Sequence, residues 1–145
     1  MASDTRSPEK QVRDLMSPLV KTLSRNDEVL SADTLMRDER IRHVPVLNED
    51  GQLAGILSQR DLFLSGLVRA LGHGTSARDR ALGGIVVKEV MTTEVITTTP
   101  ETSIRAAARI MVDRKIGCLP VLDGESLVGL LSESDIVSAV AHGEL

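Results

Sequence analysis

Apolar residues recur along this chain in two rhythms, and the order of the rhythms predicts the elements. Between residues 29 and 36, and again between 104 and 111, they recur at the spacing of a buried helix face. Short apolar runs, which are typical of buried strands, follow each of these segments: 43–47 and 53–57, then 118–122 and 127–131. An Asp-Gly turn lies within each pair of runs and favours a hairpin. The pattern predicts a helix followed by a hairpin, twice.

The two halves of this pattern form an internal repeat. Val12-Arg13-Asp14-Leu15-Met16 predicts a short helix and matches Val87-Lys88-Glu89-Val90-Met91, 75 residues later. Pro45-Val46-Leu47 matches Pro120-Val121-Leu122 at the same offset. The offset falls to 74 after the Asp-Gly turn, because a hairpin tip is where a change of length costs least. Because the alignment continues on both sides of this one-residue change, the two halves should have the same fold.

These elements predict an α+β protein of two tandem β-α-β-β-α repeats. A short strand should open each repeat, around residues 19–23 and 95–98, and a second helix should follow each hairpin. Since one repeat has only a modest core, we expect the two to pack sheet to sheet with pseudo-twofold symmetry. The predicted divisions are a flexible lead-in, a first repeat, a linker and a second repeat: residues 1–11, 12–70, 71–85 and 86–145.

Composition and charge exclude several classes of function. Aromatic residues make up 1% of the chain and the formal net charge is −4. Both features argue against binding to nucleic acid, and the charge also argues against binding to anionic membranes. Cys118 is the single cysteine and the three histidines are scattered, so neither a disulfide nor a metal site is predicted. No base accompanies Cys118, so we expect a buried small hydrophobe there and no catalytic residues. Without a membrane span or signal peptide, the sequence favours a cytoplasmic protein.

A Ser-x-x-Asp motif closes each repeat, directly after the last predicted strand. The first is Gly55-Ile56-Leu57-Ser58-Gln59-Arg60-Asp61, and the second is Gly129-Leu130-Leu131-Ser132-Glu133-Ser134-Asp135. Ser-x-x-Asp is an ordinary capping pattern at the start of a helix. A hydroxyl, a carboxylate and free backbone N–H groups also suit a sugar diol that carries a phosphate. The residues alone leave both interpretations open.

The combined pattern resembles the CBS domain, and two copies in tandem resemble a CBS pair, also called a Bateman module. The resemblance rests on the apolar-Pro-Val-apolar strand, the Gly turn and the Gly-apolar-apolar-Ser-x-x-Asp motif, and it covers about residues 12–70 and 86–141. It implies binding of adenosyl compounds in clefts between the repeats: AMP, ADP, ATP, NAD or S-adenosylmethionine. No appended enzyme, channel or DNA-binding region is left unassigned, so the chain resembles a free-standing CBS pair.

The resemblance also implies roles for individual residues. Ribose contacts would come from the motif residues Asp61, Asp135, Ser58 and Ser132. Adenine contacts would come from residues near the first strand and the strand before the hairpin: Thr22, Ile41, Val44, Thr97, Ile116 and Leu119. The alternative for each of these residues is a role in the hydrophobic core. Thr102 would approach phosphate, although as a helix N-cap it would already have a sufficient role.

Phosphate needs positive charge, and the two repeats differ in it. The first has Arg42 and His43 before Pro45, with Arg60 inside its motif, and we expect these three to bind phosphate. Compensation of an acidic surface is the alternative. The second repeat has uncharged or acidic residues at the matching positions, and an acid near phosphate is unfavourable unless a metal ion intervenes: Gly117, Cys118, Glu133 and Ser134. We therefore expect unequal ligand sites.

The predicted function is a non-catalytic regulatory module that senses adenine nucleotides, for example as an energy sensor, and passes ligand occupancy to an unidentified target protein. Exposed apolar surface on the helices should favour a homodimer. The alternative is an interaction or dimerisation scaffold that keeps the fold and binds no nucleotide.

Overall fold

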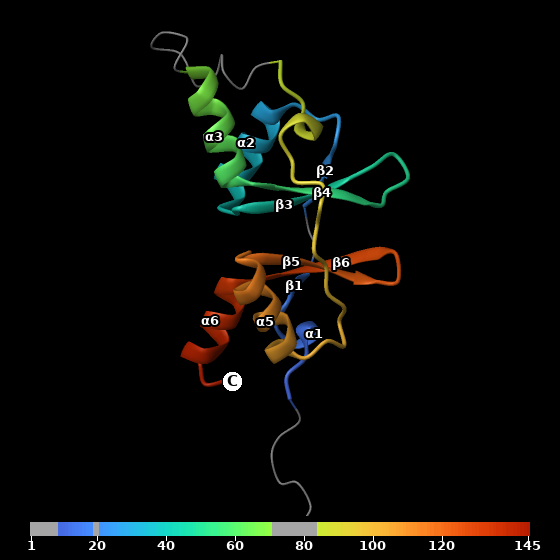
Figure 1. The fold of residues 1–145 in the computed structure, drawn as a ribbon, viewed down its shortest axis with the longest axis vertical. Helices are drawn as coiled ribbons and strands as arrows, with labels where there is room; N and C mark the ends of the chain where they lie inside the picture. Colours follow the sequence, from blue (N-terminus) through green and yellow to red (C-terminus); the bar gives the residue numbers. More distant parts are fainter. Residues whose placement is uncertain (1–8, 19–20, 71–83) are drawn as a thin grey trace, which may run out of the picture. The chain divides into compact units, whose positions relative to one another are not determined.

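The structure, a computed structural model, describes residues 9–18, 21–70 and 84–145, and it divides into two compact units (Figure 1). Unit 1 combines Met1–Leu19 with Ile96–Leu145, whereas unit 2 is the continuous segment Val20–Val95. Each unit is a mixed α+β body with a three-stranded sheet of its own. Helices in the described residues are all too short or too polar to cross a membrane.

Unit 2 is built around a hairpin with helices before and after it. Its elements are β2 (Leu23–Ser24), α2 (Val29–Glu39), β3 (His43–Leu47), β4 (Leu53–Ser58), α3 (Gln59–Ala70) and the 3-10 helix η1 (Val87–Glu89). The sheet order is β2-β3-β4, with β2 parallel and β4 antiparallel to β3. The register sets His43 opposite Ser58, so the start of β3 lies beside the start of α3.

Unit 1 repeats the hairpin with a helix before and after it, but its third strand pairs with the other hairpin strand. Its elements are α1 (Val12–Leu15), β1 (Ser17–Pro18), α5 (Ile104–Arg114), β5 (Cys118–Asp123), β6 (Ser126–Ser132) and α6 (Glu133–Ala141). The sheet order is β1-β6-β5 and both pairings are antiparallel. Cys118 lies opposite Ser132, as His43 lies opposite Ser58 in unit 2.

The two sequence repeats exchange their first elements between the units. Val12, from the first repeat, has no exposed surface and packs in the unit 1 core with Leu119 and Leu131. Val87, from the second repeat, is equally buried in the unit 2 core beside Leu57. Backbone hydrogen bonds fix both insertions, for example from the Val12 N–H to the Thr102 carbonyl at 2.8 Å. Compact units and sequence repeats are therefore different divisions of the chain.

The glycine that opens each motif makes room for the exchanged segment. A Cβ atom on Gly55 would lie 2.7 Å from the Thr92 carbonyl oxygen, and one on Gly129 would lie 2.8 Å from that of Ser17. Real Cβ atoms essentially never come so close to a backbone atom. Glycine is therefore required at both positions by the close approach of another backbone segment.

The hairpins and long helices match the sequence predictions, but the opening strands do not. The predicted strand at 95–98 is wrong, since only Thr98 forms an isolated bridge, to Val121. Around 19–23 the structure has two short strands, which end at Pro18 and begin at Leu23, with 19–20 outside the described residues. Residues 1–8 of the predicted lead-in and 71–83 of the predicted linker also lie outside them.

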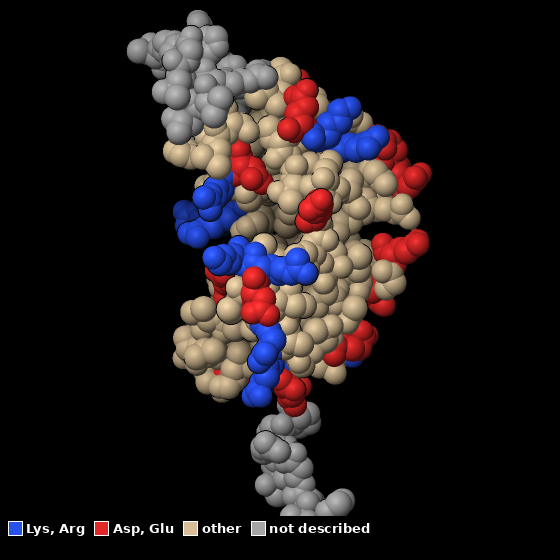
Figure 2. Space-filling model, in the orientation of Figure 1, with Lys and Arg blue, Asp and Glu red and all other residues tan. Residues whose placement is uncertain are grey.

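Charged side chains are interspersed on the face seen in Figure 2, where basic and acidic groups alternate among uncharged ones. The face shown there therefore offers no single-sign field that would attract a polyanion.

Candidate functional site

Both Ser-x-x-Asp motifs form capping boxes. In unit 2 the Ser58 N–H donates to Asp61 Oδ2 at 3.2 Å, and the Asp61 N–H donates to Ser58 Oγ at 3.0 Å. The corresponding distances for Ser132 and Asp135 in unit 1 are 2.8 and 3.3 Å. Each motif therefore starts its helix, which confirms the capping interpretation. These hydrogen bonds engage Oδ2 of each carboxylate, so capping leaves Oδ1 of Asp61 for a ligand. In unit 1, Asp135 Oδ1 accepts from the Ser17 hydroxyl at 3.5 Å.

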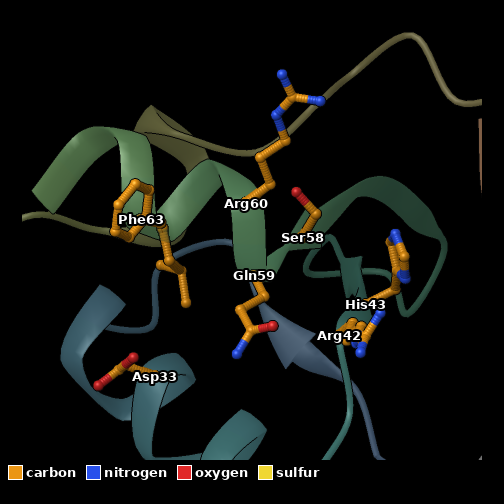
Figure 3. A pocket seen from close by; sticks show the side chains of 8 residues that line it. Asp33, Arg42, His43, Ser58, Gln59, Arg60 and Phe63 are labelled. Atoms are coloured by element: carbon orange, nitrogen blue, oxygen red, sulfur yellow. The ribbon is translucent and has the colours of Figure 1, made fainter. Parts of the chain in front are cut away.

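A pocket of about 430 Å³ lies beside the unit 2 motif. That volume is within the range of small-molecule sites, roughly 300–1,000 Å³. Eight residues line it, and Figure 3 shows that they come from α2, the start of β3, the end of β4 and the first turns of α3: Asp33, Arg42, His43, Ser58, Gln59, Arg60, Leu62 and Phe63. The structure thus brings Arg42, His43 and Arg60 to one cavity, and their role in phosphate binding stays a prediction.

Strand pairing and helix start hold these residues in place. The Gln59 N–H donates to the Arg42 carbonyl at 2.7 Å, which ties the first residue of α3 to the residue before β3. His43 lies opposite Ser58 across the hairpin, on the same side as the helix start. The positive end of the α3 dipole adds to the two arginines at this edge. The arginines and the helix dipole favour an anion at this edge, although the Asp61 carboxylate already lies in the first turn of α3.

The matching place in unit 1 has the opposite character. Gly117 replaces Arg42, and its carbonyl accepts from the Glu133 N–H at 2.9 Å. A Cβ on Gly117 would lie 3.4 Å from the Glu133 Cδ, so the carboxylate covers the backbone from which an arginine extends in unit 2. Burial, with the negative charge of Asp135 as the second cause, raises the pKa of Cys118 to about 12. This cysteine is a protonated, buried side chain, as expected.

The comparison with known proteins now identifies the family. The CBS domain model matches residues 12–66 and again 87–142. The chain belongs to the CBS domain family. It is 34% identical to the CBS domain-containing protein YhcV of Bacillus subtilis over 125 residues, which cover 86% of this chain and 81% of that protein.

Solved CBS structures have the same fold. A putative acetoin utilization protein (AcuB) from Vibrio cholerae is 33% identical, with a TM-score of 0.77 over 93% of each chain. CBSX2 in complex with AMP is 24% identical, with a TM-score of 0.76 over 94% of this chain and 99% of that one, and it shows the fold alone. The CBS domain pair of MJ0100, in complex with 5′-methylthioadenosine and S-adenosyl-L-methionine, is 25% identical, with a TM-score of 0.72 over 95% of this chain and 100% of that one.

Some CBS relatives are much longer proteins. Homoserine O-acetyltransferase of Methanosphaerula palustris is 29% identical over 91% of this chain, which spans only 24% of that enzyme. The match covers a CBS portion of the longer protein, so its enzymatic name does not extend to this chain.

The other residues predicted from the CBS resemblance have mixed surroundings. Val44 and Leu119 have no exposed surface and lie in the two cores, while Ile41 and Ile116 are half-buried against them. Thr22 is exposed and Thr97 half-buried, and the adenine contacts of all six stay predictions. The N-cap alternative for Thr102 is wrong: Ser103 caps α5, accepting from the Ala106 N–H at 3.1 Å. The Thr102 hydroxyl lies 2.7 Å from that of Thr99.

Four residues that line the pocket were not predicted from the sequence: Asp33, Gln59, Leu62 and Phe63. Two of them have a feature in the sequence that could have identified them. Phe63 is the only aromatic residue of the chain. Asp33 follows Val29 by four residues on the apolar face of a helix, where the second repeat has Ala108. The described part of the chain holds no cluster of three His, Cys, Asp or Glu side chains suited to a metal ion.

Proposed function

We propose that this CBS pair is a non-catalytic regulatory module that binds an adenosyl ligand beside Ser58 and Asp61 and conveys its presence to a partner protein. One observation carries the proposal: Arg42, His43 and Arg60 line a single ligand-sized pocket at the motif. The complexes of CBSX2 with AMP and of MJ0100 with adenosyl compounds support adenosyl ligands as the class. The candidates are AMP, ADP, ATP, NAD and S-adenosylmethionine.

The chemistry of the pocket accounts for both polar parts of such a ligand. Asp61 does not line the pocket itself, but it is half-buried and bonded to Ser58, which does. Its Oδ1 can accept a hydrogen bond from a ribose hydroxyl while Oδ2 continues to cap α3. The guanidinium of Arg42 or Arg60 can donate two parallel hydrogen bonds to phosphate oxygens. An anion at this place also meets the N-terminus of a twelve-residue helix.

A homodimer in the cytoplasm is the assembly that we propose. Phe63 on α3 and Val137 on α6 occupy matching positions in the two repeats, and both side chains are mostly exposed. A second copy of the chain would cover these apolar positions. Light scattering at high protein concentration should give the mass of a dimer, and a monomer would overturn this part of the proposal.

Calorimetry with the five candidate ligands tests the binding function. At 100 times its dissociation constant, a ligand should stabilise the protein by about 2.7 kcal/mol, which a thermal shift detects. Asp61→Asn should weaken the dominant site about tenfold, because a carboxylate accepts from a hydroxyl better than an amide does. Asp135→Asn is the matched control in unit 1 and should leave that site unchanged.

Absence of binding by all five ligands would overturn the proposal. It would favour the alternative, a CBS-fold interaction or dimerisation scaffold that has no nucleotide ligand. Equal losses in the two Asn variants would instead count against the assignment of the dominant site to unit 2.

A further inference from the structure

Asp33 is a buried charge that the proposed function does not use. Among the described residues it is the only charged one in the buried class, with 6% of its surface exposed. It lies on α2 between core residues and lines the pocket beside the motif. Arg37, one helical turn further, approaches Asp33 Oδ2 with its Nη2 at 3.0 Å.

Packing does not explain this carboxylate. Its neighbours on the same helix face are apolar, namely Val29, Ala32 and Met36, and the matching position of the second repeat is Ala108. Burying a carboxylate costs free energy unless it is paired. Its partner Arg37 is 55% exposed, so their ion pair is partly screened by water and adds little stability. Asp33 also lines the pocket, where its carboxylate can act on a ligand.

The position of Asp33 in the pocket gives that role. Figure 3 shows Asp33 on α2 at one side, Arg42 and His43 at the other, and Gln59 between them. Arg42 and His43 therefore lie across the cavity from Asp33, while Arg60 lines it from the first turn of α3. An occupant can place negative charge at Arg42 and His43, but charge that extends toward Asp33 meets repulsion in a partly desolvated space.

We propose that Asp33 selects among adenosyl ligands by the length of their anionic group. The inference rests on the proposed function and deepens it. A ligand with a single phosphate, or one whose phosphates lead to a hydroxyl or amino donor, satisfies both ends of the pocket. A linear triphosphate brings a further negative charge toward Asp33. The pocket therefore prefers AMP, or a dinucleotide such as NAD, to ATP.

Titration calorimetry of AMP, NAD and ATP against wild type and three variants tests this selection. Asp33→Asn keeps the shape and removes the charge, so ATP affinity relative to AMP should rise about tenfold. Arg37→Gln removes one cation from beside the carboxylate, so the same ratio should fall. Asp38→Asn removes a charge from the exposed side of α2 and should leave the ratio unchanged.

The outcomes separate the inference from the function on which it rests. If wild type binds none of the three ligands, the proposed function fails and the inference fails with it. If wild type binds them but Asp33→Asn leaves the ATP-to-AMP ratio unchanged, only the inference is overturned. Equal effects of Asp33→Asn and Asp38→Asn would also overturn it, since they would show a general charge effect. If Asp33→Asn does not fold, Arg37→Gln decides, and an unchanged ratio there overturns the inference.

Discussion

The two units use the same backbone to start a helix after a hairpin, yet the side chains around that start differ in charge. Both helices begin with a Ser-x-x-Asp capping box, and in both the residue after the serine hydrogen-bonds to the carbonyl before the first hairpin strand. Around this shared geometry four residues change between unit 2 and unit 1: Arg42 to Gly117, His43 to Cys118, Gln59 to Glu133, and Arg60 to Ser134. The capping residues are the same in both units because the fold needs them. The residues between and beside them can differ, and their charges determine which ligands each unit favours.

The two units also differ in how they are assembled from the chain. Unit 2 is one continuous stretch of chain, whereas unit 1 takes its first elements from residues before position 20. In unit 1, α1 and β1 supply the buried Val12 and one of three strands. The two units therefore depend differently on distant parts of the chain.

The largest effect should come from separating the units. We expect a fragment of residues 20–95 to fold alone, because it contains every element of the unit 2 core, η1 included. A fragment of residues 96–145 should stay unfolded until a peptide of residues 9–19 is added, since it lacks Val12 and β1. Circular dichroism and urea denaturation measure both outcomes.

A shorter fragment, residues 20–83, provides the control. It lacks Ile85 and Val87, which are buried in the unit 2 core, and should lose cooperative unfolding. Independent folding of 96–145 without the peptide would contradict the view that unit 1 is completed by the first repeat.

Alanine at the motif glycines should destabilise both units alike. Gly55→Ala and Gly129→Ala each place a Cβ against a backbone oxygen at under 3 Å, so each should cost about 1–3 kcal/mol in urea unfolding. Gly117→Ala is the control, because its Cβ would meet only the flexible Glu133 side chain at 3.4 Å. A cost for Gly117→Ala as large as that for Gly129→Ala would refute the backbone explanation.

The fold was predictable from sequence where it depends on local periodicity. The two hairpins and the helices beginning at Val29 and Ile104 follow the apolar pattern, because each buries one regular face. The exchange of the first elements was not predictable, since Val12 and Val87 are placed by contacts with residues far away in the chain. At 95–98, where a strand was expected, only Thr98 pairs with a strand residue, Val121 of β5.

The candidate site was predictable in part. The basic side chains beside Pro45 and within the first motif stood out because the second repeat lacks them, and the structure brings them to one pocket. The α2 side of that pocket was missed, because a single acid on an apolar face gives no periodic signal. Only the packing of α2 beside α3 brings Asp33 into the cavity.

Exchanging one charge between the motifs should sharpen the difference in ligand preference. Gln59→Glu gives unit 2 the acid that unit 1 has at Glu133, so it should weaken binding of phosphate-bearing ligands about tenfold. Adenosine, which has no phosphate, should lose little affinity. The measurement is calorimetry with AMP and adenosine.

Glu133→Gln is the control for this exchange. It removes an exposed carboxylate from unit 1 and should leave AMP binding at the unit 2 pocket unchanged. An equal loss of AMP and adenosine affinity in Gln59→Glu would indicate a distorted helix start and would contradict the electrostatic explanation.

The smallest effect concerns an ion pair that only unit 2 can make. Glu49 Oε1, at the hairpin tip, lies 3.0 Å from Arg25 Nε, whereas the counterpart of Arg25 in the second repeat is Pro100. A backbone hydrogen bond, followed by the hydrogen bond from Arg25, lowers the pKa of Glu49 from its ordinary value of 4.5. Since the folded pKa is the lower one, the stabilisation is complete above pH 4.5 and is lost as the pH falls through the folded value.

In the Glu49→Gln variant, the stability of the fragment 20–95 should therefore decrease slightly less as the pH is lowered. The urea midpoint, measured from about pH 6 down to about pH 3, compares the variant with wild type. Asp50→Asn, at the neighbouring exposed position, is the matched control and should keep the wild-type slope. Glu49 is fully exposed, so added salt should shrink the difference between the two variants. If Glu49→Gln and wild type have the same slope at low salt, the Arg25 contact does not distinguish unit 2 from unit 1 in solution.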